Sequence, residues 1–127
     1  MKKEEYYRDI KNNPLRDKTR NFSLRIIKLY KYLTEDYKEY IFSKQILRSG
    51  TSIGANVAEA IYAQSKKDFI TKLSISLKET SETEYWLDLL YHSDYIKEKE
   101  FESMWSDAEE IRKILISSIK TSKSSLT

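Results

Sequence analysis

Apolar residues recur at intervals of three and four along most of this chain, the spacing that gathers them on one side of an α-helix. In the first such segment, Asn13 and Pro14 suit the cap and the first position of a helix. We expect that helix to cover about residues 14–34. Its apolar stripe consists of Phe22, Ile26, Leu29 and Leu33.

Three further segments show the helical pattern. Ser43 suits the cap of a helix over about residues 43–63, and Ser65 with Asp68 resembles a capping box that begins a helix over about residues 66–93. A fourth helix is expected over about residues 98–120, followed by a tail without apolar periodicity that should fray. The stripe positions, helix by helix, are Ile46, Ile53, Val57 and Ile61; then Ile70, Leu73, Leu77, Thr80, Glu84, Leu87 and Tyr91; then Phe101, Trp105, Ala108, Ile111 and Leu115.

The connections between these segments are short, which favours antiparallel neighbours. With two Gly, one Pro and 34% charged residues in 127, the composition is far from that of an all-β domain. We therefore predict an all-α protein, an antiparallel up-and-down four-helix bundle that forms one domain over residues 1–127.

Both glycines of the chain fall inside the second predicted helix, in the stretch LRSGTSIGANVAEA. Gly50, Gly54 and Ala58 form one row with almost no side chain. Because a glycine inside a helix costs about 1 kcal/mol relative to alanine, the row predicts close approach of another backbone. A polar row lies beside it, which indicates that this helix packs against something specific. The polar row consists of Arg48, Ser52, Asn56 and Glu59.

Charge is unevenly distributed along the chain. Residues 1–33 hold ten Lys and Arg against four Asp and Glu, net +6, whereas residues 79–110 hold two against eleven, net −9. One interpretation is that the first helix contacts nucleic-acid phosphates. The others are that these cations are solvated, or that subunits pair basic with acidic surfaces. The candidate phosphate-binding residues are Arg16, Lys18, Arg20, Arg25, Lys28 and Lys31.

The sequence offers little catalytic chemistry. The only histidine, His92, lies four residues after Asp88 and can touch it on one helix face, but a metal site needs more ligands. Neither a Glu-x-x-His pair nor a zinc-protease motif is present, and two helical glycines cannot form a phosphate loop. We expect no catalytic residue, no metal and no cofactor. Glu84 is expected to be a buried carboxylate paired with Arg48 or another polar group.

The chain contains no cysteine and no apolar run of the ~18 residues that a membrane span requires. Its first residues are basic but lack the apolar segment of a secretion signal. We expect a cytoplasmic protein that does not bind membranes.

The stretch SKQILRSGTSIGANVAEA, followed three residues later by QSKKDFITKLSISLKETSETEYWLDLL, resembles the bacterial four helix bundle protein family. This family is also called the 23S rRNA-intervening sequence protein family, and it is related to the accessory variability determinant protein of diversity-generating retroelements. The resemblance covers about residues 21–119. It implies a ring-like homo-oligomer, typically a pentamer, without enzymatic activity. It also gives a packing or interface role to Arg48, Gly50, Ser52, Gly54, Asn56 and Glu59.

Two functions remain open. In the first, a homo-oligomer binds RNA or DNA through its basic first helix, and the affinity falls with salt. In the second, the protein is an interaction scaffold without nucleic-acid binding, such as a partner of a reverse transcriptase or a ribosome-associated factor. Its ten tyrosines and two tryptophans would then supply contact surface.

Overall fold

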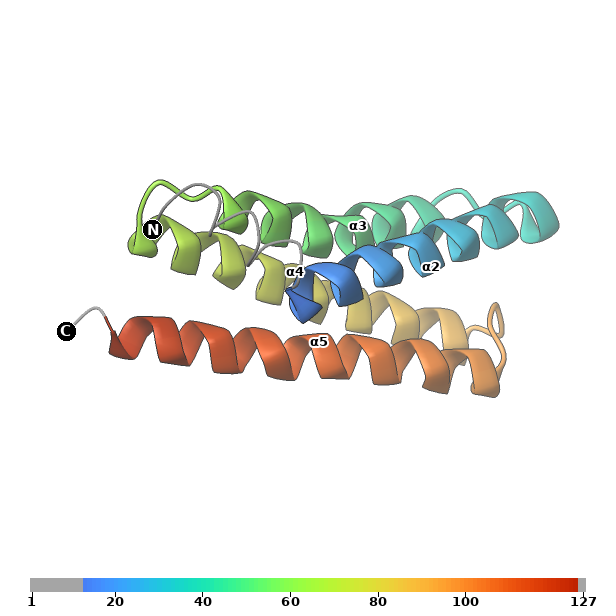
Figure 1. The fold of residues 1–127 in the computed structure, drawn as a ribbon. Coiled ribbons are helices and arrows are strands. Elements are labelled where there is room, and N and C mark those ends of the chain that lie inside the picture. Colours follow the sequence, from blue (N-terminus) through green and yellow to red (C-terminus); the bar gives the residue numbers. More distant parts are fainter. Residues whose placement is uncertain (1–12, 126–127) are drawn as a thin grey trace.

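In the computed structural model, which describes residues 13–125, four long helices run alternately up and down (Figure 1). They are α2 (Pro14–Tyr37), α3 (Phe42–Ile61), α4 (Lys66–His92) and α5 (Glu98–Ser124). The turns after α2 and after α4 lie at one end of the bundle, and the turn after α3 lies at the other. The predicted all-α antiparallel four-helix bundle is confirmed.

Two of the predicted helix starts are formed as expected. The Asn13 side chain accepts a hydrogen bond from the Leu15 N–H at 2.9 Å, and Pro14 is the first helical residue. The Ser65 hydroxyl accepts from the Asp68 N–H at 3.0 Å. These side chains satisfy N–H groups that have no partner inside their own helices.

Helix ends agree less well with the sequence patterns. α2 continues three residues past the expected position 34 and ends at Tyr37, and the Lys38 cap that follows has the left-handed φ of 54°. α5 continues to Ser124 rather than ending at 120, so most of the tail expected to fray is helical. Hydroxyl side chains support this last turn, where Ser124 donates to the Lys120 carbonyl at 3.1 Å.

The start of α3 corrects the prediction that Ser43 is its cap. Ser43 lies inside the helix and is buried. The carboxylate of Glu39 accepts instead from the backbone N–H groups of Ile41, Phe42 and Ser43 at 2.9, 3.0 and 2.7 Å. A longer side chain, three residues before the first residue of the helix, therefore caps its N-terminus.

The bundle core is formed by the predicted apolar stripes. Phe22, Ile26, Leu29 and Leu33 of α2 are all buried. Four stripe positions, Leu77, Tyr91, Phe101 and Trp105, are only partly buried and pack at the rim of the core. The largest fully buried side chains are Phe22, Ile26, Leu33, Ile46, Ile53, Leu73, Leu87, Leu90, Met104, Ile111, Leu115 and Val57.

Hydroxyl side chains line the contact between α3 and α4. The Ser76 hydroxyl donates to the Ile53 carbonyl at 2.8 Å, and the Thr83 hydroxyl donates to the Ser49 hydroxyl at 2.9 Å. All these polar groups are buried but paired, so they do not carry the penalty of an unsatisfied group. Their small size also lets the two helices approach closely.

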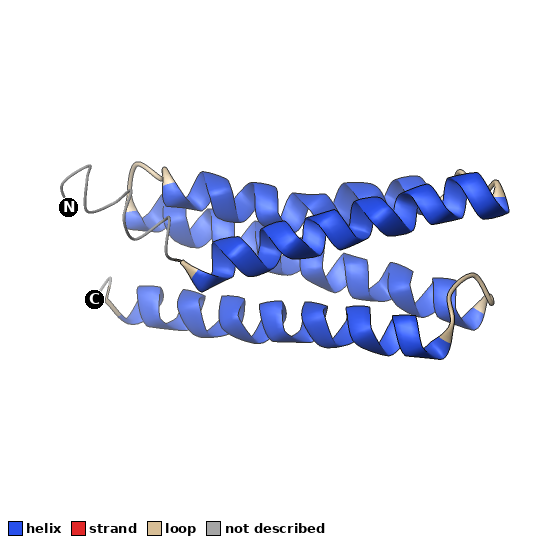
Figure 2. Cartoon of the chain, turned by 45° about the vertical axis from the view of Figure 1, so that its right-hand side comes forward, coloured by secondary structure: helices blue, strands red, loops and turns tan. Residues whose placement is uncertain are grey.

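The expected close approach of another backbone is confirmed at Gly54, where the neighbour is α2, which lies beside α3 in Figure 2. At Gly50 the neighbour from α2 is a side chain, that of Ile26. A Cβ atom on Gly50 would lie 2.6 Å from Cγ1 of Ile26, and one on Gly54 would lie 3.2 Å from the Thr19 carbonyl oxygen. Ala58 is exposed, so the close contact ends after Gly54. Within residues 13–125, no helix is both long enough and apolar enough to span a membrane.

Candidate nucleic-acid interface

The six candidate cations all lie on α2, but two of them already have partners on α5. Lys18 Nζ lies 2.6 Å from Glu110 Oε1. Arg25 lies 2.6 Å from a carboxylate oxygen of Asp107 and 3.3 Å from one of Glu100. Some of the basic residues of α2 therefore form ion pairs with acidic residues of α5 in the same chain.

The other four cations, Arg16, Arg20, Lys28 and Lys31, form no ion pair with any residue in the described part of the chain. Their spacing places them on the side of α2 opposite the buried stripe, and all but the half-buried Arg16 are exposed. We call these four residues the outward basic face. Leu24, 50% exposed, and Ile27, 37% exposed, lie among them.

In the polar row of the family motif, the first and last residues, Arg48 and Glu59, form ion pairs with α4. Arg48 pairs with Glu82 and, at 3.2 Å, with Glu79. Glu59 reaches Lys72 of α4 at 3.8 Å. The two residues between them bond to their own helix: Ser52 donates to the Arg48 carbonyl at 2.6 Å, and Asn56 donates to the Ser52 carbonyl at 2.8 Å.

Glu84 is buried as expected, but its partner is Arg112 of α5 rather than Arg48. Arg112 Nε lies 3.2 Å from Glu84 Oε1. Burial raises the pKa of Glu84 above its ordinary range, and the nearby Arg112 charge opposes that rise without cancelling it. A carboxylate tied to an arginine inside the bundle is a structural pair.

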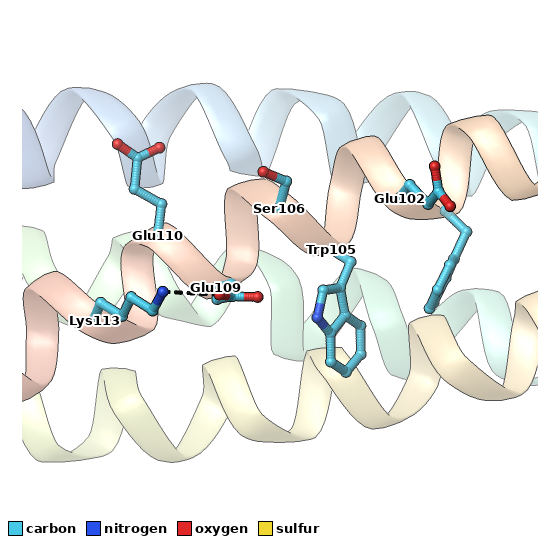
Figure 3. A pocket seen from close by; sticks show the side chains of 7 residues that line it. Glu102, Trp105, Ser106, Glu109, Glu110 and Lys113 are labelled. Atoms are coloured by element: carbon cyan, nitrogen blue, oxygen red, sulfur yellow. Dashed lines mark ion pairs between the residues drawn. The ribbon is translucent and has the colours of Figure 1, made fainter.

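The remaining acidic groups are dispersed. His92 Nδ1 lies 3.0 Å from Asp88 Oδ1, as expected from their spacing, and both side chains are exposed. Along α5, a surface hollow of about 390 Å³ is lined by Glu102, Glu109 and Glu110 (Figure 3). In that view Glu110 points toward α2, and Glu109 is paired with Lys113 at 2.9 Å. Among residues 13–125, no three His, Asp or Glu side chains converge on a point where a metal could bind.

The sequence patterns did not indicate a second feature beside the outward basic face. A groove of about 570 Å³ lies between α2 and the turn that precedes α5. Three tyrosine rings from both elements meet near it: Tyr32 and Tyr37 lie 5.3 Å apart between centroids, and Tyr37 and Tyr95 lie 5.5 Å apart. The groove is lined by Arg25, Lys28, Leu29, Tyr32, Ile96, Lys97 and Glu100.

Comparison with known proteins places this geometry in a family. The model of the 23S rRNA-intervening sequence protein family matches residues 11–117. A crystal structure of a protein of unknown function from the S23 ribosomal protein family of Bacteroides thetaiotaomicron VPI-5482 superposes with a TM-score of 0.83. It is 57% identical, and the match covers 84% of this chain and 98% of that one. No curated protein matches. The chain belongs to the 23S rRNA-intervening sequence protein family.

Proposed function

We propose that this protein is a non-enzymatic, cytoplasmic homo-oligomer that binds RNA or DNA through the outward basic face of α2. The observation that supports the proposal is the position of Arg16, Arg20, Lys28 and Lys31, which lie on one side of a helix and lack carboxylate partners in the described structure. Such cations bind backbone phosphates and release the counterions that surround them, which gives affinity without sequence preference.

Assembly strengthens binding of this kind. Each chain offers only a few phosphate contacts, so a single copy should bind weakly. An oligomer that presents several copies of the face to one nucleic acid converts later contacts into intramolecular ones and raises the overall affinity. A pentamer, the state implied by the family resemblance, would provide five such faces.

The proposal is tested by measuring fluorescence anisotropy of labelled RNA and DNA at several salt concentrations. We expect the logarithm of the affinity to fall linearly with the logarithm of the salt concentration. Changing Arg16, Arg20, Lys28 and Lys31 to glutamate should abolish binding and leave the helical circular dichroism unchanged, because these positions avoid the core.

A matched variant controls for net charge. Lys44, Lys67, Lys78 and Lys120 are exposed on α3, α4 and α5, so changing them to glutamate alters the net charge equally but spares α2. This variant should retain most of the binding. Absence of salt-sensitive binding by the wild type at low ionic strength would refute the proposal, as would equal loss in both variants.

A second function is favoured by a separate observation, the exposure of Leu24 and Ile27 within the outward basic face. Apolar side chains flanked by cations are typical of a surface that contacts a protein. In this alternative the same face binds a protein partner such as a reverse transcriptase or a ribosome-associated factor. Changing Leu24 and Ile27 to serine would then abolish partner binding, whereas phosphate binding would change little.

A further inference from the structure

The groove between α2 and the turn before α5 has an excess of positive charge. Of its three cations, Arg25 is neutralised by Glu100, which also lines the groove, and by Asp107. Lys28 and Lys97 have no carboxylate partner among residues 13–125. Two unpaired ammonium groups at the walls of one groove attract a single phosphate more strongly than two isolated lysines do.

The aromatic side of the groove is held in place by the tyrosine cluster. The Tyr32 ring meets Tyr37 at 73°, and Tyr37 meets Tyr95 at 79°, so both contacts are edge to face. The Tyr32 and Tyr37 hydroxyls are also 3.2 Å apart. The Tyr32 side chain remains 37% exposed and lines the groove.

The state of the phenol suits a site for an anion. The hydrogen bond to Tyr37, together with partial desolvation, raises the pKa of Tyr32 to about 12. Tyr32 is neutral at physiological pH, as a tyrosine with its ordinary pKa near 10 also is, so it does not repel a phosphate. Its ring offers a flat apolar surface beside two ammonium groups.

We propose that this groove binds single-stranded nucleic acid, with a backbone phosphate at Lys28 and Lys97 and an unpaired base stacked on Tyr32. The inference rests on the proposed function and adds a preference to it. Bases in a duplex are stacked on one another and cannot reach an aromatic side chain, whereas single strands can turn their bases outward. The outward basic face would bind either form, and the groove would select the single strand.

The experiment compares two groove variants, Tyr32→Leu and Lys97→Ala, with two exposed residues that do not line the groove, Tyr40→Leu and Lys99→Ala. Affinities for a short oligouridine and for an RNA duplex of equal length are measured at several salt concentrations. We expect Tyr32→Leu to weaken single-strand binding about tenfold with an unchanged salt slope, and to leave duplex binding unaltered. Tyr32→Phe should retain single-strand binding because its ring still stacks.

Lys97→Ala should weaken single-strand binding and reduce the salt slope by about 0.7, the value for one lost phosphate contact. Tyr40→Leu and Lys99→Ala should behave as wild type. Photo-crosslinking of the wild type to RNA that carries 5-iodouridine locates the contact without any variant, and the crosslinked tyrosine should be Tyr32.

The outcomes separate the two proposals. If Tyr32→Leu binds the single strand like wild type and the crosslink maps elsewhere, the groove inference is wrong, while salt-sensitive binding that depends on the outward basic face leaves the proposed function intact. If the wild type binds neither RNA, both fail. Equal weakening of single-strand and duplex binding by Tyr32→Leu would also overturn the inference, because stacking on a base cannot explain it.

Discussion

At Gly50 and Gly54, a side chain added to the helix should lower the stability of the bundle. A Cβ on Gly50 would lie within 2.8 Å of three carbon atoms of the buried Ile26 side chain. We expect Gly50→Ala to destabilise the protein by about 1–3 kcal/mol through overpacking, although alanine favours the helix by about 1 kcal/mol. Gly54→Leu should cost at least as much, because Thr19 backbone atoms lie against that position. Thermal and urea unfolding measure both effects.

The cause can be isolated by pairing Gly50→Ala with Ile26→Ala. Removing the Ile26 side chain leaves space for the new methyl group, so the double variant should be more stable than the sum of the two single changes predicts. Strict additivity, or a higher melting temperature for Gly54→Leu, would contradict the packing explanation.

Single residues also show what could be predicted and what could not. Asn13 and Ser65 act within three residues of themselves, so the local pattern was sufficient to identify both caps. Ser43 has the residue type of a cap, but the chain before it turns through Lys38 and brings the Glu39 carboxylate to the N–H groups of Ile41, Phe42 and Ser43, so the helix begins earlier. The backbone path of the turn determines that Glu39, and not Ser43, caps the helix, and the residue types alone do not predict that path.

The turn between α2 and α3 depends on Glu39, and this makes its stability sensitive to pH. Burial alone would raise the pKa of Glu39, but hydrogen bonds from Phe42, Ile41 and Ser43 outweigh it and hold the pKa below its ordinary range. The stabilisation is therefore fully present above the ordinary glutamate pKa of about 4.3, and it is lost as the pH falls through the lowered value.

Replacing Glu39 by Ala should cost about 1–2 kcal/mol at neutral pH, as for other lost helix caps. The stability difference between wild type and Glu39→Ala should shrink as the pH is lowered below the ordinary carboxyl range. Urea unfolding at neutral and acidic pH measures both quantities. A difference that is constant with pH would show that the charge of Glu39 contributes nothing.

The contact between α4 and α5 contains the buried pair of Glu84 and Arg112. Arg112→Ala would leave the Glu84 carboxylate buried without a counter-charge, which should destabilise the protein by about 2–3 kcal/mol, somewhat less than for a fully buried pair because Arg112 is partly exposed. Adding Glu84→Gln should recover part of the loss, since no buried charge then remains. Unfolding of the single and double variants tests this, and no recovery would contradict it.

At the candidate site, the sequence does not predict which residues of different helices pair with one another. The composition of α2 showed a basic helix, but not that Lys18 and Arg25 are taken by acidic residues of α5. The same limit applies to Glu84: the residue types allow Arg48 as its partner, but Arg48 pairs with Glu79 and Glu82. Lys97 and Tyr32 are 65 positions apart in sequence, and only the antiparallel arrangement brings both to one groove.

For the whole molecule, the main expectation is assembly. Apolar side chains remain on outer surfaces of several helices, including Leu24 of α2, Ile75 and Tyr85 of α4, and Ile116 of α5. The bundle core does not cover them, and burying them between copies of the chain would remove apolar surface from water. Light scattering coupled to size exclusion should therefore give a mass that is a multiple of 15.1 kDa, with five copies as the expected number.

Measuring the mass of the oligomer at several salt concentrations distinguishes two causes of assembly, apolar contacts and charge pairs between copies. If apolar contacts hold the copies together, the oligomer should persist in high salt and in the variant with Arg16, Arg20, Lys28 and Lys31 changed to glutamate, since screening weakens only charge pairs. If basic α2 of one copy instead pairs with acidic residues of the next, both treatments should dissociate it. A monomer of 15.1 kDa at micromolar concentration would refute assembly, and without several linked faces the proposed nucleic-acid binding would be limited to the weak contacts of one chain.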